Sequence, residues 1–496
     1  MASEAALWLF GDQLGPHFHR APTVRRLPVL LIESRRALGR RPTHRQKLHL
    51  VVSGMRHLAH ELGDRATLLC ADTYREGLLR YGRPVVVYEP GSRAAAGLVE
   101  RLRDVVQEIL PTPGFLLSRT EFNTWAAGRE RFRMEDFYGG QREAFDVLLR
   151  DGEPVGGRLS YDTENRESPP KDRERLDLRR PYRPREDAID AQVRSDLDGM
   201  AADRLIQPAG RDARRVFPAS RREARRALAT FTAHRLPHFG PLEDAMLADD
   251  PAMTHSLLSA PLNLGLLSPR EVIAAAESRY WNSSAPLRSV EGFIRQVLGW
   301  REYVWQLYWY VGPGYLERNA LDATAPLPRW WRELDADAVE ARCLRTTLTA
   351  VRDRGWVHHI QRLMVLGNHA LQRGYDPAEL TDWFATAFVD GTPWVMPVNV
   401  IGMSQYADGG LVTTKPYAAG GAYINRMSDY CRDCRYDPKV RLGADACPFT
   451  AGYWSFVDRH RDRLATNPRT SRAVASARRL SDLSDVLAQE SGRTTF

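Results

Sequence analysis

The chain has 496 residues, of which 43% are hydrophobic, and a formal net charge of +8. This length predicts two to four domains with sizeable cores. No apolar run approaches the roughly 18–20 residues that cross a bilayer, which argues against an integral membrane protein. The first ten residues lack a cationic stretch followed by a long apolar one, so we expect no signal peptide, a cytoplasmic location and no membrane partner.

Most of the basic residues are arginines. Guanidinium groups match phosphate oxygens, so this composition favours a nucleic acid as partner. An arginine-rich coding bias would give the same count, and charge alone does not separate the two. The twelve tryptophans suit stacking surfaces or electron transfer, although a large aromatic core also needs them.

Residues 1–150 alternate short apolar runs with helix-length segments such as 43–62 and 93–108. The expected strands are 6–10, 29–32, 67–70, 84–88 and 115–117. This rhythm predicts a Rossmann-like parallel sheet covered on both faces. Gly11-Asp-Gln-Leu14 follows the first strand, where such sheets bind ligands, and an ordinary turn is the alternative. Cys70 ends an expected buried strand and is predicted to be an inert core thiol.

The remaining chain divides into a polar stretch and a helical one. Residues 151–215 are rich in Arg, Asp, Glu, Pro and Gly, which predicts an interdomain linker that includes short helices. Residues 216–496 show helical periodicity and form the predicted second domain, all-α in class. Within it, Asp376-Pro-Ala-Glu379 is a helix start, and the apolar stripe that follows directs Trp383 inward.

Four of the five cysteines suggest a metal centre. Cys431 and Cys434 share one tight turn, Cys447 precedes a proline, and Cys343 lies 88 positions before Cys431. Without a secretion signal, an odd number of cysteines argues against disulfides. One C-x-x-C with a distant Cys and a final Cys-Pro favours an iron–sulfur cluster over zinc. Zinc and simple structural or redox thiols remain alternatives from spacing alone.

Several strings in the chain are long or distinctive enough to compare with known families. They are Asn399-Val-Ile-Gly-Met-Ser-Gln-Tyr-Ala-Asp-Gly-Gly, Thr414-Lys-Pro-Tyr, Gly421-Ala-Tyr-Ile-Asn-Arg-Met-Ser-Asp-Tyr-Cys431, Gly11-Asp-Gln-Leu14, Leu242-Glu-Asp-Ala-Met246, His255-Ser256, Leu262-Asn-Leu-Gly-Leu-Leu-Ser-Pro269 and Gly299-Trp-Arg-Glu302. These strings resemble the iron–sulfur bacterial cryptochromes and photolyases, also called photolyase-related proteins. The resemblance covers nearly the whole chain and is weakest between 151 and 215. It implies a cryptochrome/photolyase fold: an α/β antenna domain, a linker and a helical FAD domain.

The resemblance also implies cofactors and an activity. The cofactors would be FAD, a 4Fe-4S cluster on the four cysteines and the antenna 6,7-dimethyl-8-ribityllumazine. The activity would be light-driven repair of pyrimidine-pyrimidone 6-4 photoproducts in UV-damaged DNA, by electron transfer from reduced, photoexcited FAD. We expect a monomer. Two alternatives are a blue-light photoreceptor with the same cofactors and a non-photochemical iron–sulfur protein that binds nucleic acid.

Family positions assign the FAD pocket residue by residue. The segment expected to contact the pyrophosphate, with its neighbours in the pocket, comprises His255, Ser256, Leu258, Ser259, Asn263 and Arg301. Arg362 and Asp390 match the pair beside the flavin ring. Without the resemblance, the serines read as helix caps and the pair as a buried structural ion pair.

The lesion side of the pocket is assigned in the same way. His358-His-Ile-Gln-Arg362 resembles the His-His-x-x-Arg of the 6-4 photolyases, so His359 matches their catalytic histidine, with His358 the weaker candidate. Leu363 stands where eukaryotic enzymes have a further histidine, which argues against a two-histidine mechanism. Tyr417 and Tyr423 match tyrosines near the lesion.

Electron transfer and the antenna complete the assignment. Trp383 matches the tryptophan nearest the flavin in the photoreduction chain, and Trp330 and Trp331 are both candidates for an outer donor. The lumazine contacts would be Asp12, Gln13 and Leu14, with Glu33 and Lys47 as further candidates, and a magnesium ion is expected at most through Asp162.

Overall fold

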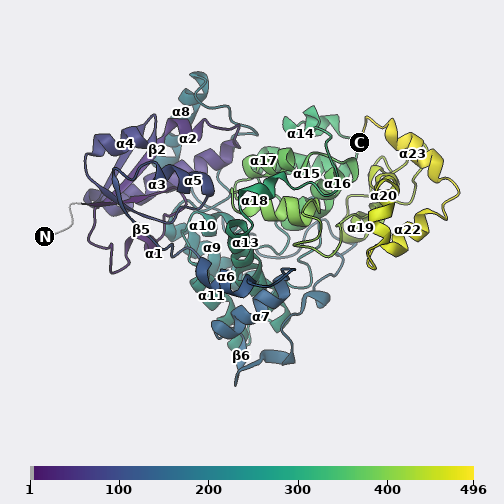
Figure 1. The fold of residues 1–496 in the computed structure, drawn as a ribbon, viewed down its shortest axis with the longest axis horizontal. Coiled ribbons are helices and arrows are strands. Elements are labelled where there is room, and N and C mark those ends of the chain that lie inside the picture. The colour runs from purple at the N-terminus through teal and green to yellow at the C-terminus, as the bar shows by residue number, and fades with distance from the viewer. Residues whose placement is uncertain (1–4) are drawn as a thin grey trace.

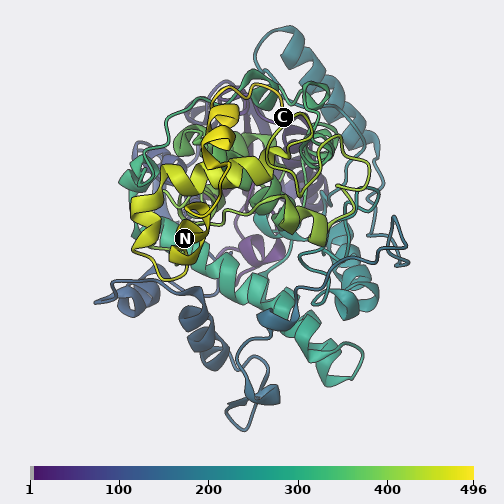
Figure 2. The same cartoon turned by 90° about the vertical axis from the view of Figure 1, so that its right-hand side faces the viewer.

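The computed structural model describes residues 5–496. The elements form an α/β region at the N-terminal side and a larger helical region that continues to the C-terminus. Figure 1 shows the sheet at one end of the long axis and the last helices at the other. Viewed from that second end, the C-terminal helices lie in front of the rest of the helical region (Figure 2).

Within this range the α/β region holds a five-stranded parallel sheet of order β3-β2-β1-β4-β5. The residues of β1, β2 and β4 are all buried, because helices cover both faces of a parallel sheet. The strands are β1 (Ala6–Leu9), β2 (Val29–Ser34), β3 (Ala66–Ala71), β4 (Val85–Tyr88) and β5 (Val106–Leu110). The predicted parallel, Rossmann-like sheet is therefore confirmed.

Helices connect the strands, and the longest of them has 18 residues. They are α1 (Pro16–His19), α2 (Arg35–Leu38), α3 (Arg45–Leu62), α4 (Tyr74–Tyr81) and α5 (Arg93–Glu100). The chain order along the sheet reverses between β1 and β4, so the loops after these two strands meet at a topological switch point. There Asp12 lies so near Gly91 that a Cβ on the glycine would come 2.2 Å from Asp12 Oδ2.

Three sequence expectations for this region are wrong. The segment 93–108 is not one helix, because α5 ends at Glu100 and β5 begins at Val106. The segment 115–117 is not a strand: Phe115 stacks on Trp305 at 3.9 Å, and Glu302 accepts the Leu116 amide at 2.8 Å, so the helical region holds it. Cys70 is exposed rather than buried, because β3 is an edge strand.

Residues after the sheet cross to the helical region. Helices α6 (Arg119–Ala126) and α7 (Met134–Ala144) pack against α13 (Glu302–Tyr310), and Tyr303 Oη donates to the Phe132 carbonyl at 2.8 Å. The polar stretch 151–215 contains one long helix, α8 (Ala188–Ala202), which returns to pack on α3.

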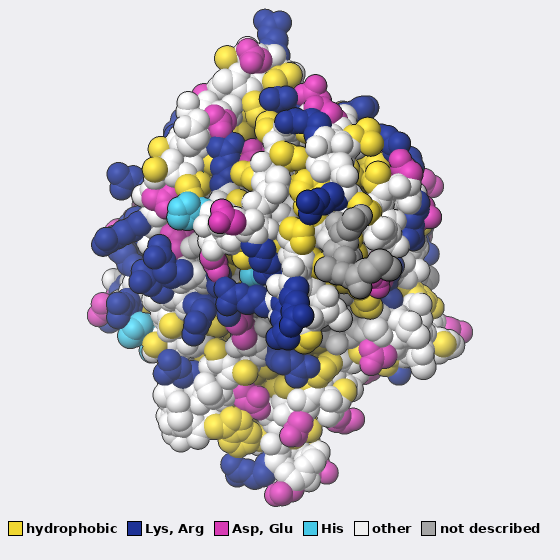
Figure 3. All heavy atoms as spheres, turned by 90° about the vertical axis from the view of Figure 1, so that its left-hand side faces the viewer, with side chains coloured by type: hydrophobic (Ala, Val, Ile, Leu, Met, Phe, Trp, Pro, Cys, Tyr) yellow, Lys and Arg dark blue, Asp and Glu magenta, His cyan; other side chains and the backbone are white. Residues whose placement is uncertain are grey.

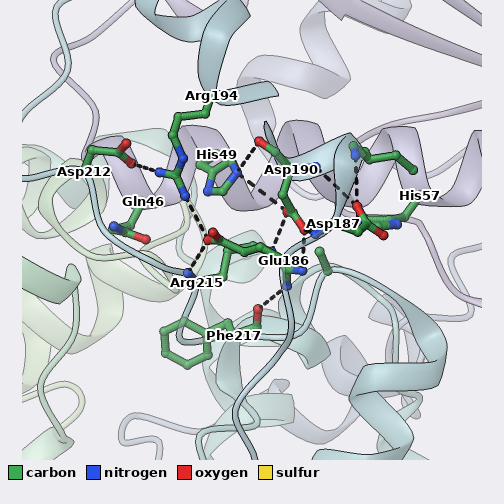
Figure 4. Close-up of polar contacts among 12 residues, drawn as sticks. Gln46, His49, His57, Glu186, Asp187, Asp190, Arg194, Asp212, Arg215 and Phe217 are labelled. Carbon is green, nitrogen blue, oxygen red and sulfur yellow. Dashed lines mark hydrogen bonds and ion pairs between the residues drawn. The ribbon is translucent and has the colours of Figure 1, made fainter. Parts of the chain in front are cut away.

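A buried ion network fixes the end of this polar stretch (Figure 4). Arg215 Nε donates to Asp190 Oδ1 at 2.6 Å, and its Nη1 donates to Glu223 Oε2 at 3.0 Å. Asp190 lies on α8 and Glu223 on α9 (Arg221–His234), so one guanidinium joins two helices. All three side chains are at most 9% exposed, so removing one partner would leave a buried charge unpaired.

The helical region is built as predicted, with α17 (Pro377–Ala387) beginning at the expected cap: Asp376 Oδ1 accepts the Ala378 and Glu379 amides, each at 2.8 Å. Three of its segments are π-helical: η5 (Arg295–Arg301), η8 (Gln361–Gly367) and η9 (Val398–Ser404). The other helices of eight residues or more are α11 (Pro269–Trp281), α12 (Leu287–Ile294), α15 (Arg342–Arg354), α20 (Pro448–Arg459) and α23 (Leu483–Ser491). Shorter helices are α10 (Ser259–Asn263), α14 (Arg329–Arg332), α16 (Asn368–Arg373), α18 (Val395–Pro397), α19 (Gly421–Met427), α21 (Arg461–Ala465) and α22 (Ser471–Ala477).

Polar contacts join the two regions directly. Leu14 donates its amide to the Leu264 carbonyl at 2.9 Å, and Lys47 Nζ donates to the Ala385 carbonyl at 2.7 Å and to that of Gly391. In the part of the chain that the structure describes, no helix has both the length and the apolar character needed to span a membrane.

Candidate functional site

A cavity of about 350 Å³ lies inside the helical region. All three π-helical segments contribute to its wall, together with α10 and residues around Asp390. A π-helical turn holds an extra residue and so redirects side chains, which is why such turns recur at functional sites. The wall combines apolar side chains with a few convergent polar ones, the composition expected of a cofactor site.

The polar groups of the cavity meet at Asp390. Arg362 forms a two-point ion pair with it, Nη1 to Oδ1 at 2.9 Å and Nη2 to Oδ2 at 3.1 Å. Ser259 Oγ donates to Oδ2 at 2.6 Å, and Asn263 Nδ2 donates to the Asp390 carbonyl at 3.0 Å. All four side chains line the cavity, so two separate sequence motifs and Asp390 converge there.

Arg301 reaches the same cavity from η5. Its Nη1 donates to the Gly114 carbonyl at 3.1 Å and lies 3.2 Å from Glu302 Oε1, while its buried Nε has no hydrogen-bond partner among the described residues. Burial lowers the pKa of Arg301. A buried guanidinium with an unpaired donor suits an anionic ligand, and with Ser256 and Leu258 on the same wall the residues present fit FAD.

Three histidines lie together beside this cavity. His255 and His358 stack with ring centroids 4.5 Å apart, and His359 lies edge-on to His255 at 5.3 Å. His359 is half-exposed and lines the cavity, whereas the other two are buried. Burial lowers the pKa values of both His255 and His358 well below the ordinary range. Of the predicted pair, only His359 is placed to meet a substrate.

Asp244 is a functional candidate that sequence reasoning did not single out. Its Oδ1 lies 3.3 Å from His359 Nε2. Burial raises the pKa values of Tyr417 and Tyr423, and the charge of Asp244 adds to the increase at both. Asp244 thus contacts the histidine directly and acts on both predicted tyrosines through its charge. The only sequence signal was its place inside the string Leu242-Glu-Asp-Ala-Met246.

A row of tryptophans leads from the interior towards the surface. The Trp383 and Trp331 rings are 5.4 Å apart, and Trp331 and Trp330 are also 5.4 Å apart. Trp331 is fully buried and Trp330 half-buried. The two candidates for the outer electron donor, Trp330 and Trp331, therefore stand in one row with Trp383, and Trp331 is the middle ring.

The four clustered cysteines lie at the ends of three helices, α15, α19 and α20, and Cys434 Sγ accepts the amide of Arg342, the first residue of α15, at 3.4 Å. Cys343 lies in the first turn of α15, Cys431 and Cys434 follow α19, and Cys447 caps α20. All are free thiols. Burial, and then the charges of Cys447, Cys431 and Cys434, raise the pKa of Cys343, as expected if the four sulfurs share one site.

The spacing of these sulfurs bears on which group they fit. Among residues 5–496, no three of them offer sulfurs within 4.8 Å of one another. Tetrahedral zinc with bonds of about 2.3 Å would hold thiolates about 3.8 Å apart. The wider arrangement fits an iron–sulfur cluster, which is larger than a single ion.

The predicted antenna residues occupy different places. Asp12 lies at the switch point, and burial raises its pKa to about 6. Gln13 holds the turn, accepting the Phe10 amide at 3.2 Å, and Leu14 is core. Glu33 accepts Arg56 at 2.8 and 2.9 Å. Lys47 faces the other way, towards the helical region, and burial lowers its pKa to about 8.

Asp162 does not fit the expected magnesium site. Arg295 Nη2 lies 2.8 Å from its Oδ1, and Arg166 donates to its Oδ2. Although burial alone would raise the pKa of Asp162, these two guanidinium groups lower it. A carboxylate already paired with two cations offers little to a third.

A separate basic groove runs between α3, the start of α8 and α9. Its lining includes Arg20, Arg185, Arg222, Arg225 and Arg226. The face of the molecule on the side of the N-terminal region carries many basic side chains with fewer acidic ones among them (Figure 3). These surfaces agree with the polyanionic partner expected from composition.

Comparison with known proteins decides the family. The model of the family "Deoxyribodipyrimidine photo-lyase-related protein" matches residues 7–205. A (6-4) photolyase of Agrobacterium fabrum is 38% identical over 495 residues, which cover 96% of this chain and 95% of that protein. The chain belongs to the photolyase-related family. Membership makes it an enzyme of the DNA photolyase class and implies FAD as cofactor.

Solved structures agree on the fold of this photolyase. A bacterial class III photolyase from Agrobacterium tumefaciens superimposes with a TM-score of 0.59 at 16% identity, covering 97% of this chain and 98% of that one. A cryptochrome from Synechocystis superimposes with a TM-score of 0.57 at 14% identity, covering 86% and 89%. The cryptochrome/photolyase fold predicted from the sequence is confirmed.

Proposed function

We propose that this photolyase repairs pyrimidine-pyrimidone 6-4 photoproducts in DNA. The observation that carries the proposal is the half-exposed His359 at the cavity, with Asp244 3.3 Å from its ring nitrogen. The near full-length relative named as a (6-4) photolyase supports the same substrate. Repair of this lesion requires a proton to move between two joined bases, and an imidazole is the side chain best suited to move it near neutral pH.

The residues around His359 would have different roles in repair. Asp244 would fix the ring orientation and stabilise the imidazolium while it holds the proton, as a carboxylate does beside a catalytic histidine. Tyr417 and Tyr423 would stack on or hydrogen-bond to a base turned out of the duplex. Both tyrosines are partly buried, so most of each ring is already held in place by the protein.

Different residues of the cavity would bind the flavin ring and the pyrophosphate of FAD. Arg362 and Asp390 would lie beside the flavin ring, and Ser256, Ser259 and Arg301 would take the pyrophosphate. When bound and reduced, FAD supplies on excitation the electron that opens the lesion. The largely apolar wall would exclude water from this part of the site.

The tryptophan row would deliver electrons to the cavity. Trp383, Trp331 and Trp330 are in sequential ring contact, and the outermost ring is the one that solvent reaches. Phe384 and Phe388 also contact Trp383, but a phenyl ring is too hard to oxidise to serve as a relay.

We further propose a 4Fe-4S cluster on the four cysteines and a lumazine antenna at the switch point. The wide sulfur spacing supports the cluster over zinc. Asp12 supports the antenna site, because its half-buried carboxyl has no cationic partner among residues 5–496 and so suits a neutral heterocycle that can hydrogen-bond to it.

Blue-light treatment of an oligonucleotide that carries a single 6-4 photoproduct tests the proposal. We expect restored pyrimidines in the light and none in the dark, with a cyclobutane dimer as comparison substrate. If the reduced protein restores neither lesion while binding FAD fully, a photoreceptor role replaces repair.

A further inference from the structure

The three histidines beside the cavity form a constellation that repair chemistry does not fully use. One ring nitrogen from each of His255, His358 and His359 lies within 4.8 Å of the others. His255 Nε2 and His358 Nδ1 have no hydrogen-bond partner among the described residues, although both side chains are over nine-tenths buried. Buried nitrogens without partners are costly unless something binds them.

The positions of these rings come from two separate loops. His255 follows a backbone turn in which Met253 has φ of 45°, and its amide donates to the Ala252 carbonyl at 2.8 Å. His358 lies just before η8, where its amide donates to Gln361 Oε1 at 3.2 Å. These two amide bonds fix the main chain that carries each imidazole, without relying on any contact between the rings.

The chemistry of this donor set matches one class of ligand. Three imidazoles suit Zn²⁺ and similar borderline divalent metals, and a bond of about 2.0–2.1 Å would bring the nitrogens to about 3.3 Å. From the present spacing of at most 4.8 Å, the nitrogens would have to close by at most about 1.5 Å when an ion binds. Asp244 beside His359 supplies the carboxylate that usually orients a metal-bound histidine. The half-exposed His359 gives the ion a path from solvent.

We propose that His255, His358 and His359 form a binding site for one Zn²⁺ ion, and that its occupation blocks repair. The ion would take the lone pair of His359 that the proton transfer needs. The inhibitory part rests on the proposed function, whereas the binding part does not.

A second group of side chains has metal-ligand spacing, but we do not propose a metal site there. His57, Asp187 and Asp190 also lie within 4.8 Å of one another. Asp190, however, is bonded to Arg215 through both oxygens, at 2.6 and 2.8 Å (Figure 4). A metal there would have to displace a buried guanidinium. This group therefore supplies a matched control.

Titration calorimetry of the full chain with ZnCl₂ in the dark, with its cofactors bound, tests the binding. We expect one Zn²⁺ per chain and no binding of Mg²⁺, which prefers oxygen ligands. His359→Gln should weaken Zn²⁺ binding at least about tenfold, since even losing a residue that only orients a ligand commonly costs that much. The half-exposed position makes this variant safe for folding, and His57→Gln should bind as the unchanged chain does.

Three results would overturn the site: no saturable binding by the unchanged chain, equal affinity in His359→Gln, or equal affinity in His255→Gln, the second variant. Repair assays with Zn²⁺ added and then removed by EDTA test the consequence separately. Tight binding with undiminished repair would reject the inhibition yet keep the site, and absence of repair without Zn²⁺ would reject the proposed function instead.

Discussion

Asp244 and His359 come from parts of the chain 115 residues apart and meet with 3.3 Å between Oδ1 and Nε2. The carboxylate is largely buried, at 18% exposed, whereas the imidazole is 49% exposed. A fixed carboxylate behind a ring that faces the cavity is the arrangement in which a histidine can accept and return a proton without turning. The pair is thus the most specific indication of chemistry in the molecule.

His359→Ala is expected to lower the rate of 6-4 repair by about 100–10,000-fold, the range typical of a general acid–base group. Asp244→Asn keeps the shape but removes the charge that stabilises the imidazolium, so it should lose repair less completely. Absorption spectra should show unchanged FAD content in both. His238→Gln, on the exposed surface, serves as control. Normal repair by His359→Ala would contradict the assignment.

Cys431→Ala and Cys447→Ala are expected to give insoluble or cofactor-poor protein. The four thiols join the start of α15 to the segment after α19 and the cap of α20, so a shared cluster would tie residues far apart in sequence. Iron content and FAD absorption are the measurements. Cys70→Ala should behave as the unchanged chain, since that thiol lies exposed on the edge strand. A soluble Cys447→Ala protein with full FAD and normal repair would show the cluster to be dispensable.

The features that the sequence predicted correctly are those that a short stretch of residues determines by itself. The apolar runs of β1, β2 and β4 and the Asp376 cap follow from short stretches of sequence, and the structure has them. The prediction of a strand at 115–117 was wrong because contacts with residues far along the chain determine the conformation of this segment. Its residues look like a strand, but stacking of Phe115 on Trp305 and the Glu302 carboxylate hold it as a loop.

The site itself was only half accessible from sequence. Motif resemblance located Arg362, Asp390 and His359, whereas Asp244 became visible only through a contact across the fold. The π-helical segments were also missed, because one extra residue in a turn barely alters hydrophobic periodicity. Lys47 was assigned to the antenna, yet its ammonium points to carbonyls on either side of Asp390, a contact between regions that no local pattern encodes.

For the chain free of lumazine, Asp12→Asn is expected to raise the free energy of unfolding, and to raise it more at pH 7 than at pH 5. Burial raises the folded-state pKa of Asp12 to about 6, above its ordinary 3.8. The folded state therefore holds this proton more tightly than the unfolded state, so the contribution of Asp12 to stability falls as pH rises from about 4 to about 6. The advantage of the variant in free energy of unfolding should grow by about 1 kcal/mol between the two pH values.

Urea denaturation at both pH values measures this difference. Only the change relative to the unchanged chain matters, because other carboxylates contribute equally to both proteins. Gln13→Leu, beside it, should show no such pH dependence. A constant difference between pH 5 and pH 7 would place the Asp12 carboxylate in water rather than in the crevice.

Trp331→Phe separates the electron path from repair. The middle ring of the row lies 5.4 Å from both Trp383 and Trp330, so its loss interrupts the route between the interior and the surface. Photoreduction of FAD, followed by absorption under blue light, should slow markedly, whereas repair by protein reduced chemically beforehand should persist. Phe keeps most of the buried volume, so we expect the chain to fold, with some loss of stability from the small cavity that the smaller ring leaves. Trp383→Phe should act in the same direction, and Trp281→Phe, which alters an exposed ring outside the row, should have no effect. If Trp331→Phe photoreduces at the unchanged rate, electrons enter by another route, and the row of rings is core packing alone.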